Sequence, residues 1–444
     1  MGNGEMKLNR YPKYKPTGIA WLPEVPEGWE VRRLKYAITS LRKGKGITKD
    51  DVFDDGDLPC VRYGEIYSKY DSCFDVCISK TRVEVVAKPQ YFEKGDILFS
   101  CTGELVEEIG KNIVYCGEGR CAAGGDIIVI SHNQEPKFLN YYLGSYPTQR
   151  QKSYGKAKLK VVHIHALDIQ NLVTLLPPLP TQRAIVAFLD EKCGKVDRLV
   201  AAKEREVALL KELKQAMIAE AVTGATHVAR TDTARKMKPS GIPWLPEVPE
   251  GWEVKRLKGL FSLRRESYSP NEQLQVLSLI KDVGVIPYEE KGQLGNKSKE
   301  DISGYNVARK GDIVMNSMNV IIGSVDITPF DGYISPAYYA LTARQGVEHK
   351  YFNYLFHLTL VQKMMRSLAK GILEIRLRIS ITSLLGMSFP VPPLAEQRAI
   401  VAYIEARAAK IDAAVAGLER EIAAMKEYKQ RLIADVVTGQ RKVA

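Results

Sequence analysis

Two stretches of the chain carry apolar residues in a repeating pattern that predicts long helices. From 391 to 439 the apolar positions mostly alternate in steps of four and three residues, and the same pattern runs from 177 to 224. This spacing places one apolar stripe along one face of a helix, as in a coiled coil. The stripe comprises Val196, Val200, Val207, Leu210 and Met217 in the first stretch and Ile411, Val415, Leu418, Ile422, Met425 and Leu432 in the second.

The ends of both helices are marked in the sequence. A proline pair at 177–178 or 392–393 precedes each helix and cannot lie inside it, and each stretch ends on Thr-Gly. Each helix is expected to span roughly 40 residues, or about 60 Å. A lone helix would leave its apolar stripe in water, so we expect the two helices to pack together. They should run antiparallel, because the intervening chain must return before the second helix begins.

A second repeated sequence lies well upstream of each predicted long helix. The sequence WLPEVPEGWEVRRLK at 21–35 recurs as WLPEVPEGWEVKRLK at 244–258, with a single change from Arg32 to Lys255. Its prolines and Gly-Trp turn exclude a helix or a central strand, so we expect a rigid extended hook that enters a strand at Glu30. Two interpretations of the tryptophans remain open: an anchor against the base of a helix, or a surface that docks a partner.

Between each hook and its helix lies a segment with the strand and turn signals of a mixed domain. Short β-rich runs such as KGDILFSCTG and GGDIIVISH are punctuated by glycine, and helices are expected from about Phe138 and Tyr351. The tripeptide Lys-Gly-Asp at 94–96 recurs at 310–312, whereas the sequences that follow it differ greatly. A shared frame with unlike loops is typical of two scaffold copies that bind different things.

These observations predict an α+β protein with a pseudo-two-fold internal repeat. Two α/β domains are joined by two long antiparallel, coiled-coil-like helices. The expected boundaries are 1–176 for the first domain with its N-terminal arm, 177–224 for the first helix, 225–240 for a basic linker, 241–390 for the second domain and 391–444 for the second helix.

The charge of the chain favours an anionic partner. The formal net charge is +12 and the pI is near 9.1, which indicates nucleic acid first, although a solvated basic surface gives the same balance. No apolar run approaches the ~20 residues that span a bilayer, and the N-terminus has no apolar signal core. We therefore expect a cytoplasmic protein with no membrane partner.

The cysteines are confined to the first half of the chain. Six of the seven precede residue 122, and the seventh is Cys193. A zinc site on Cys73, Cys77, Cys116 and Cys121 is conceivable, but their spacing misses the CxxC pattern of structural zinc ligands, and the second half has no cysteine. We therefore expect reduced, partly buried thiols and no metal site.

The motifs of several common enzyme classes do not occur in the sequence. There is no GxxxxGKS/T phosphate loop, no GxGxxG before a helix and no HExxH. Two acidic-acidic-lysine triplets, at 190–192 and 289–291, have the order of a nuclease motif, but charge-rich segments produce such triplets by chance. His163 and His165 are spaced to share one strand face, without a recurring third ligand. We expect no catalytic residue in this chain.

Basic clusters stand at the same place in both domains, shortly before the proline pairs. This positive charge fits contact with DNA backbone phosphates, although a solvated helix end has the same composition. The candidates are Arg150, Lys152, Lys156, Lys158 and Lys160 in the first domain and Lys363, Arg366, Lys370, Arg376 and Arg378 in the second.

The loops that differ between the domains are where base edges would be read. Arginine favours guanine and asparagine favours adenine, because their side chains match the hydrogen-bonding groups of those bases. The candidates are Arg62, Tyr63, Thr102, Asn112 and Arg120 in the first domain and Asn316, Asn319, Ser335 and Tyr338 in the second.

The paired hooks and the PPLxxQR motifs that open both helices resemble the specificity subunit of type I restriction-modification systems, which serve phage defence. The motif ends on Gln182 and Arg183 in the first copy and on Gln397 and Arg398 in the second. The resemblance covers nearly the whole chain. The first copy departs from the family in one position, because it has Thr181 where the second copy has the more usual glutamate.

The resemblance implies a division of labour between subunits. Each domain is then a target-recognition domain that reads one half of a split, asymmetric sequence in double-stranded DNA, and the helices form a spacer that docks two methyltransferase subunits. This chain would hold no cofactor. S-adenosylmethionine would be bound by the methyltransferase subunits, which methylate adenine, and ATP and Mg²⁺ by a separate restriction subunit where one is present. Two alternatives remain open: a helical scaffold that binds nucleic acid non-specifically, and a self-contained DNA enzyme.

Overall fold

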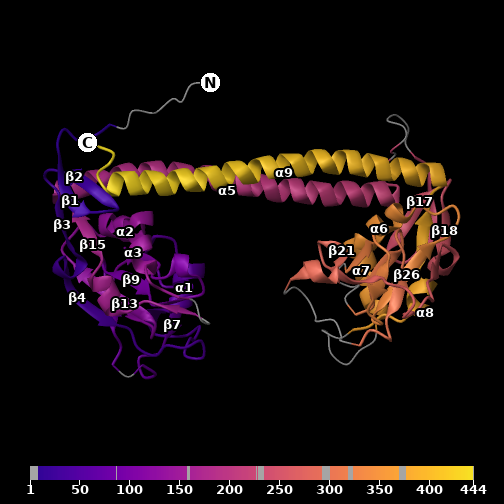
Figure 1. Cartoon of the computed structure of the whole chain (residues 1–444), viewed down its shortest axis with the longest axis horizontal. Coiled ribbons are helices and arrows are strands. Elements are labelled where there is room, and N and C mark those ends of the chain that lie inside the picture. The colour runs from indigo at the N-terminus through magenta and orange to yellow at the C-terminus, as the bar shows by residue number, and fades with distance from the viewer. Residues whose placement is uncertain are drawn as a thin grey trace. The chain divides into compact units, whose positions relative to one another are not determined.

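The structure is a computed structural model of the chain, shown in Figure 1. It describes residues 9–443 except 87, 158–160, 227, 229–234, 293–300, 319–323 and 370–376. The chain divides into two compact units: unit 1 comprises residues 1–204 and 419–444, and unit 2 comprises residues 205–418. Each unit therefore contains one folded domain and a part of both long helices.

The two long helices are α5, Leu179–Thr223, with 45 residues, and α9, Leu394–Val437, with 44 residues. Each begins directly after its proline pair, where the sequence predicts the start. Gly224 and Gly439 follow the helix ends with left-handed φ angles of +79° and +75°. Glycine adopts such angles without a steric penalty, which explains the Thr-Gly stop signals.

The helix segments run antiparallel within unit 1. Lys429 Nζ of α9 lies 2.6 Å from a carboxylate oxygen of Asp197 on α5. Further along α5, Glu204 pairs at 2.8 Å with Lys426, which precedes Lys429 on α9. The residue numbers of the paired positions rise along α5 as they fall along α9, so the two helix segments are antiparallel. Figure 1 draws α5 in magenta and α9 in yellow.

The same direction holds within unit 2. Lys214 of α5 lies 2.7 Å from Asp412 of α9, and the later α5 residue Val222 shares a core with the earlier α9 residue Ile404. The predicted apolar seam lies on the inner sides of both helices. Val200, Val207, Met217, Val415, Ile422 and Leu432 are buried, and Val196, Leu210, Ile411, Leu418 and Met425 are partly buried.

Unit 1 contains fifteen short strands and, besides its parts of α5 and α9, four short α-helices among its described residues. The strands are β1 (Tyr14–Ile19), β2 (Leu22–Pro26), β3 (Glu30–Arg33), β4 (Ile38–Lys43), β5 (Leu58–Val61), β6 (Cys73–Phe74), β7 (Ser79–Thr81), β8 (Tyr91–Phe92), β9 (Ile97–Ser100), β10 (Thr102–Gly103), β11 (Asn112–Tyr115), β12 (Cys121–Ala123), β13 (Ile127–His132), β14 (Val162–His163) and β15 (Val173–Leu176). The helices are α1 (Tyr63–Ser68), α2 (Pro136–Gly144), α3 (Tyr146–Ser153) and α4 (Ala166–Gln170).

Unit 2 contains a similar series. The strands are β16 (Met237–Ile242), β17 (Leu245–Pro249), β18 (Glu253–Arg256), β19 (Phe261–Leu263), β20 (Gln275–Ile280), β21 (Gly284–Pro287), β22 (Asn306–Ala308), β23 (Ile313–Asn316), β24 (Val325–Ile327), β25 (Gly332–Ile334), β26 (Tyr338–Ala343) and β27 (Ser388–Val391). The short α-helices are α6 (His349–His357), α7 (Thr359–Leu368) and α8 (Ile381–Gly386). The helices predicted near Phe138 and Tyr351 are α2 and α6.

The two units share their sheet topology. Unit 1 has a five-stranded sheet of order β4-β13-β9-β11-β6 and a four-stranded sheet of order β7-β5-β12-β8. Unit 2 has two four-stranded sheets, of order β19-β26-β23-β24 and β21-β20-β25-β22. The orders match strand for strand except for β6, which has no counterpart beside β24 among the described residues. This repeat confirms the predicted fold class.

The hook before each domain is a hairpin followed by a strand. β1 pairs antiparallel with β2, and β16 with β17. Prolines are tolerated in these strands because both strands of a two-stranded hairpin lie at an edge. The strand expected at Glu30 is β3, which pairs with β15. β16 begins at Met237, so the last part of the segment expected to be a linker is a strand.

The second tryptophan of each hook is buried where the domain meets the long helices. Trp29 is 2% exposed and shares a core with Val436 of α9. Trp252 is 0% exposed and shares a core with Val222 of α5. The anchor interpretation is therefore confirmed for these two residues. Among the described residues, no helix combines the length and the apolar character needed to cross a membrane.

Candidate nucleic-acid interface

The repeated Lys-Gly-Asp tripeptide positions a buried carboxylate in unit 1. Arg42 Nη2 lies 2.5 Å from Asp96 Oδ2, and Ser131 Oγ donates a hydrogen bond of 2.6 Å to Asp96 Oδ1. The backbone amide of Glu93 donates to the same carboxylate at 3.0 Å. These contacts join β4, the start of β9 and β13, so the carboxylate holds the sheet together.

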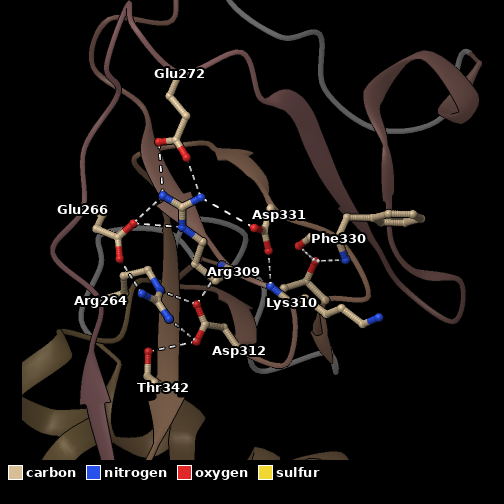
Figure 2. Close-up of polar contacts among 10 residues, drawn as sticks. Arg264, Glu266, Glu272, Arg309, Lys310, Asp312, Phe330, Asp331 and Thr342 are labelled. Carbon is tan, nitrogen blue, oxygen red and sulfur yellow. Dashed lines mark hydrogen bonds and ion pairs between the residues drawn. The ribbon is translucent and has the colours of Figure 1, made fainter.

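The equivalent carboxylate of unit 2 has the same partners, as Figure 2 shows. Arg264 Nε lies 2.5 Å from Asp312 Oδ2, and Thr342 Oγ1 donates to Asp312 Oδ1 at 2.8 Å. Asp312 is 2% exposed, and a carboxylate buried to this degree needs charged and hydrogen-bonding partners. The hydrogen bonds that the Arg264 guanidinium donates to Asp312 raise its pKa. The tripeptide is therefore part of the frame and not of a DNA-contact surface.

A second arginine of unit 2 is held by three carboxylates next to this pair. Arg309 lies 2.6 Å from Glu272, 2.8 Å from Glu266 and 3.6 Å from Asp331. Hydrogen bonds to Glu272 and Glu266 raise its pKa. Figure 2 shows the guanidinium surrounded by these acids, so its donors are already engaged within unit 2.

The glutamine of each PPLxxQR motif fixes the start of a long helix to its domain. Gln182 is 1% exposed, accepts a hydrogen bond of 2.9 Å from the amide of Glu135 and donates one of 2.8 Å to the carbonyl of Pro177. Gln397 makes the equivalent bonds, each 2.8 Å, to Glu348 and to the carbonyl of Pro392. A side chain with both a donor and an acceptor satisfies both groups at once, which explains why the motif needs glutamine.

Two of the expected base-reading residues of unit 1, Arg62 and Tyr63, line one cavity of about 700 Å³. Glu65, which is 6% exposed, accepts hydrogen bonds of 3.0 and 2.7 Å from the Arg62 guanidinium. The charge of Arg62 is therefore partly compensated within the fold. Sequence reasoning missed Lys49 and Lys69, two exposed cations that also line this cavity, because neither lies in the basic clusters before the proline pairs.

The structure corrects the expectation that Lys152 and Asn112 contact DNA. Lys152 is 1% exposed, and its Nζ donates hydrogen bonds of 2.8 Å each to the carbonyl of Gly110 and to Asn112 Oδ1. Burial lowers the pKa of Lys152 to about 7. Asn112 is 5% exposed and donates in turn to Asn140. Both side chains belong to the core of unit 1 and offer no group to DNA in this conformation.

Thr102 is likewise 7% exposed, with its hydroxyl 3.2 Å from His163 Nδ1. Arg120 is exposed, but its guanidinium lies 2.6 Å from Glu93 and its Cζ lies 5.2 Å from the ring centre of Tyr91. Thr102 therefore faces inward, whereas Arg120 stays on the surface of unit 1 in a salt bridge.

A second cavity of unit 1, of about 650 Å³, lies beside the basic segment after α3. It is lined by Arg150 and Lys156, and the ammonium group of Lys156 lies 2.6 Å from Asp168. Its walls also contain the aromatic residues Trp21, Tyr146 and Tyr154, of which Tyr154 is 88% exposed. Lys158 and Lys160 lie outside the described residues.

Three of the expected base-reading residues of unit 2 come together. Asn316, Ser335 and Tyr338 line one small cavity of about 90 Å³, together with Met318 and Tyr288. Burial raises the pKa of the Tyr338 hydroxyl, so this group stays a neutral hydrogen-bond donor at neutral pH. Asn319 lies outside the described residues.

The basic cluster of unit 2 is described only in part. Arg378 is exposed, and its Nε donates a hydrogen bond of 3.1 Å to Ser317 Oγ. Lys363 and Arg366 are exposed on α7, whereas Lys370 and Arg376 lie outside the described residues.

The disulfide joins the segment 73–77 to the segment 116–121, and neither segment contains a disulfide of its own. Cys73 forms a disulfide with Cys116, whereas Cys77 and Cys121 keep free, buried thiols, and that of Cys121 donates to the hydroxyl of Tyr115 at 3.5 Å. The expectation of reduced thiols is therefore wrong for Cys73 and Cys116, and it is confirmed for the five buried free cysteines.

One cluster with metal-ligand chemistry exists among the described residues: Cys73, Cys116 and Asp75, whose ligand atoms lie within 4.8 Å of one another. The disulfide occupies both of its sulfur atoms. The other candidates for chemistry have structural partners. His163 contacts Thr102, and Asp190 accepts hydrogen bonds of 2.8 Å from both Lys137 and Tyr141.

Comparison with known proteins identifies the family. The model of the type I restriction modification DNA specificity domain matches residues 26–207 and again 249–422. A putative type I restriction enzyme MjaX specificity subunit of Methanocaldococcus jannaschii is 25% identical, over 99% of both chains. The type I restriction enzyme StySPI specificity subunit of Salmonella potsdam is 23% identical, over 94% of this chain and 90% of its own.

A solved structure supports the fold. A chain from work on the complex assembly and conformational transition of the type I R-M system superposes with a TM-score of 0.65 at 18% identity, over 94% of this chain and 99% of that chain. The two matched segments of the family model cover most of the chain and coincide with the internal repeat. The chain therefore belongs to the family of type I restriction-modification DNA specificity subunits.

Proposed function

We propose that this chain reads a split, asymmetric sequence in double-stranded DNA with its two domains and performs no catalysis itself. The observation that carries the proposal is that the two units share one repeated frame but have unlike cavities. Both units share the strand order and the buried ion pair, at Asp96 and at Asp312. The groups that line their cavities are different, so two copies of one scaffold present different chemistry.

The unlike cavities support two different readouts. The cavity of unit 1, about 700 Å³, combines Arg62, Tyr63, Lys49 and Lys69, which suits backbone phosphates and guanine edges. The cavity of unit 2, about 90 Å³, is lined, among the described residues, by hydroxyl, amide and apolar groups without a cation, which suits hydrogen bonding from Ser335 and Tyr338 rather than contact with phosphate. Asn316 is 7% exposed and its Oδ1 accepts a hydrogen bond of 3.1 Å from the amide of Met318, so it supports this wall and does not itself face DNA in this conformation. Two unlike half-sites follow, and the full target is asymmetric.

The exposed faces of the long helices support docking of two methyltransferase subunits. On α5, Leu209 is 59% exposed and Leu213 is 56% exposed. The repeat-equivalent positions of α9 are Ala424 and Tyr428, both exposed. Each unit thus carries an apolar patch at the same position of the repeat. This patch lies outside the seam that the helices bury between them. Two equivalent patches fit two copies of one partner.

The cofactors of methylation and cleavage belong to the partners in this proposal. S-adenosylmethionine is bound by the methyltransferase subunits, and ATP with Mg²⁺ by a restriction subunit where one is present. The chain itself contributes sequence recognition and assembly.

Sequencing of DNA methylation in cells with and without the gene for this chain tests the proposal. We expect the loss of one split, asymmetric adenine-methylation motif. A palindromic or unsplit motif would contradict two unlike readers. Purified complex that binds all duplexes equally, with an affinity that collapses in salt, would favour a scaffold with non-specific nucleic-acid binding instead.

A further inference from the structure

The disulfide between Cys73 and Cys116 ties an edge strand to unit 1. Cys73 opens β6, which pairs with β11 through two residues only, and Cys116 directly follows β11. β6 is the strand with no counterpart in the described part of unit 2, and the sequence has no cysteine after Cys193. The tether is therefore specific to one of the two domains.

The two residues of this disulfide are more exposed than the other cysteines. Cys73 and Cys116 are half-buried, whereas the five free cysteines are all buried. The argument rests on the proposed function, because a protein that reads cellular DNA works in a compartment where thiols keep most cysteines reduced. Disulfides of such proteins are usually transient or redox-sensing.

The geometry points to a modification site. We propose that Cys73 and Cys116 undergo reversible thiol–disulfide exchange with a low-molecular-weight thiol and its disulfide, of which glutathione is the probe. The state of this pair sets how firmly residues 69–79 are held beside the cavity of unit 1.

The exchange balances without a further reagent. The thiolate of one glutathione attacks one sulfur atom of the pair, the S–S bond breaks, and the other cysteine leaves as a thiolate. A second glutathione thiolate attacks the resulting mixed disulfide and releases the second cysteine as a thiolate together with oxidised glutathione. The two protons lost by glutathione protonate the two cysteines. Oxidation of the pair is the reverse sequence.

Reduction should loosen β6 without unfolding unit 1, because other contacts remain. The amide of Val114 donates a hydrogen bond of 2.9 Å to the carbonyl of Ser72, and the amide of Cys116 donates one of 2.8 Å to Phe74. The rings of Phe74 and Tyr70 also pack together, with their centres 4.5 Å apart. These contacts hold the strand in place but do not cross-link it.

The tethered segment also forms the wall of the cavity in unit 1. Its lining includes, before β6 in the sequence, Arg62, Tyr63, Gly64, Glu65, Ser68 and Lys69, and after β6, Ile78 and Ser79. A looser β6 therefore changes the mobility of the groups that we expect to contact the first half of the DNA target.

A thiol count on the full-length chain tests the exchange itself. The chain is equilibrated in buffers of defined reduced-to-oxidised glutathione ratio, quenched in acid, denatured and labelled with maleimide. We expect two labels fewer in the oxidised chain, with recovery of both when reduced glutathione is restored. The double variant C73S/C116S should lose this change, and the control variant C193S should keep it.

Two results would overturn the exchange. One is a wild-type chain whose label count never changes. The other is a pair that stays oxidised in excess reduced glutathione, which would make it a permanent structural disulfide.

Hydrogen exchange and DNA binding test the consequence. Reduction should raise amide exchange severalfold in residues 69–79 and leave unit 2 unchanged, and equal exchange in both states would refute the tether. Binding of the complete complex to duplexes altered in either half-site should change with redox state for the first half only. If no duplex is bound specifically, the proposed function fails. The thiol count and the hydrogen-exchange data then still show whether Cys73 and Cys116 undergo thiol–disulfide exchange and whether their disulfide tethers β6.

Discussion

The hydroxyl of Tyr14 donates a hydrogen bond of 2.8 Å to the carbonyl oxygen of Gly439, a residue 425 positions further along the chain. This contact joins the first strand of unit 1 to the end of α9. In unit 2 the equivalent strand, β16, follows the end of α5 along the chain. The junction that unit 2 makes through the continuous backbone is thus made in unit 1 by contacts between the two ends of the protein.

The Gly439 junction yields the first prediction. A Cβ atom at this position would lie 2.5 Å from the ring of Pro26, and the φ angle is +75°. Gly439→Ala should therefore lower the free energy of unfolding by at least about 1 kcal/mol. Gly417→Ala is the matched control, because it lies inside α9 with nothing within 4 Å of the added Cβ.

Denaturant unfolding of both variants checks this prediction. The control should be more stable than the wild type by up to about 1 kcal/mol, since alanine favours helix. Equal effects of the two substitutions would mean that the end of α9 does not pack on the hook.

The second prediction concerns the buried ion pair of unit 2. Asp312→Asn leaves Arg264 without its buried partner and should cost about 3–5 kcal/mol of stability. The exposed pair Lys255 and Glu253 offers a control, because Glu253→Gln removes a salt bridge that water screens.

Thermal unfolding with a probe in each unit gives the readout. Asp312→Asn should lower the midpoint of unit 2, and the control should not move it. A midpoint equal to that of the wild type in the Asp312→Asn variant would show that the repeated tripeptide does not hold the frame.

The third prediction follows from Lys152, whose pKa is lowered by burial to about 7, below the ordinary value of a lysine. The unfolded chain then binds more protons than the folded chain between this pH and about 10. Stability relative to Lys152→Met should rise with pH across that window, by at most about 1.4 kcal/mol per pH unit, and be flat below it.

Urea unfolding of the wild type and Lys152→Met between pH 6 and 9.5 measures the difference directly. The comparison between the two proteins cancels groups that titrate in both, such as the buried cysteines. Parallel stability curves would show that Lys152 is charged and solvated in the native chain.

The fourth prediction addresses the exposed leucines of α5. Leu209→Asp combined with Leu213→Asp should keep the fold, because both side chains are already in water, and should lower stability only by the weaker helix propensity of aspartate, about 1 kcal/mol for the pair. It should abolish assembly with the methyltransferase subunit. Gln215→Asp adds one negative charge on another exposed face of the helix and serves as the control for each of the two single variants. Leu210→Asp, in the seam, should instead destabilise the chain itself.

Size-exclusion chromatography with light scattering distinguishes these cases. Full assembly of the Leu209→Asp/Leu213→Asp variant would place the docking surface elsewhere. Loss of assembly in Gln215→Asp would show that added charge alone, and not the apolar patch, is responsible.

The repeat in the sequence determined most of the architecture. Heptad spacing, proline pairs and Thr-Gly ends located α5 and α9, because helix boundaries depend on local residues. The hairpins were missed, although KPTGI at 15–19 and KPSGI at 238–242 extend the repeat upstream of Trp21. Comparing the residues before each tryptophan segment would have found β1 and β16.

The candidate contact residues were predicted less well, for a physical reason. Lys152 lies in a basic cluster, yet burial depends on the tertiary packing of α3 against Gly110, which no local pattern encodes. The pairing of Cys73 with Cys116 likewise depends on the parallel register of β6 and β11. The spacing of cysteines within one short segment therefore could not predict a disulfide between residues 43 positions apart.

Exchange of one domain shows whether the two domains read DNA independently. Residues 36–176 are replaced by the equivalent segment of a relative with a known target, and the methylation motif of the resulting complex is sequenced. We expect a hybrid motif in which one half is new and the other half is unchanged. A motif that changes in both halves, or in neither, would contradict two independent readers on one repeated frame.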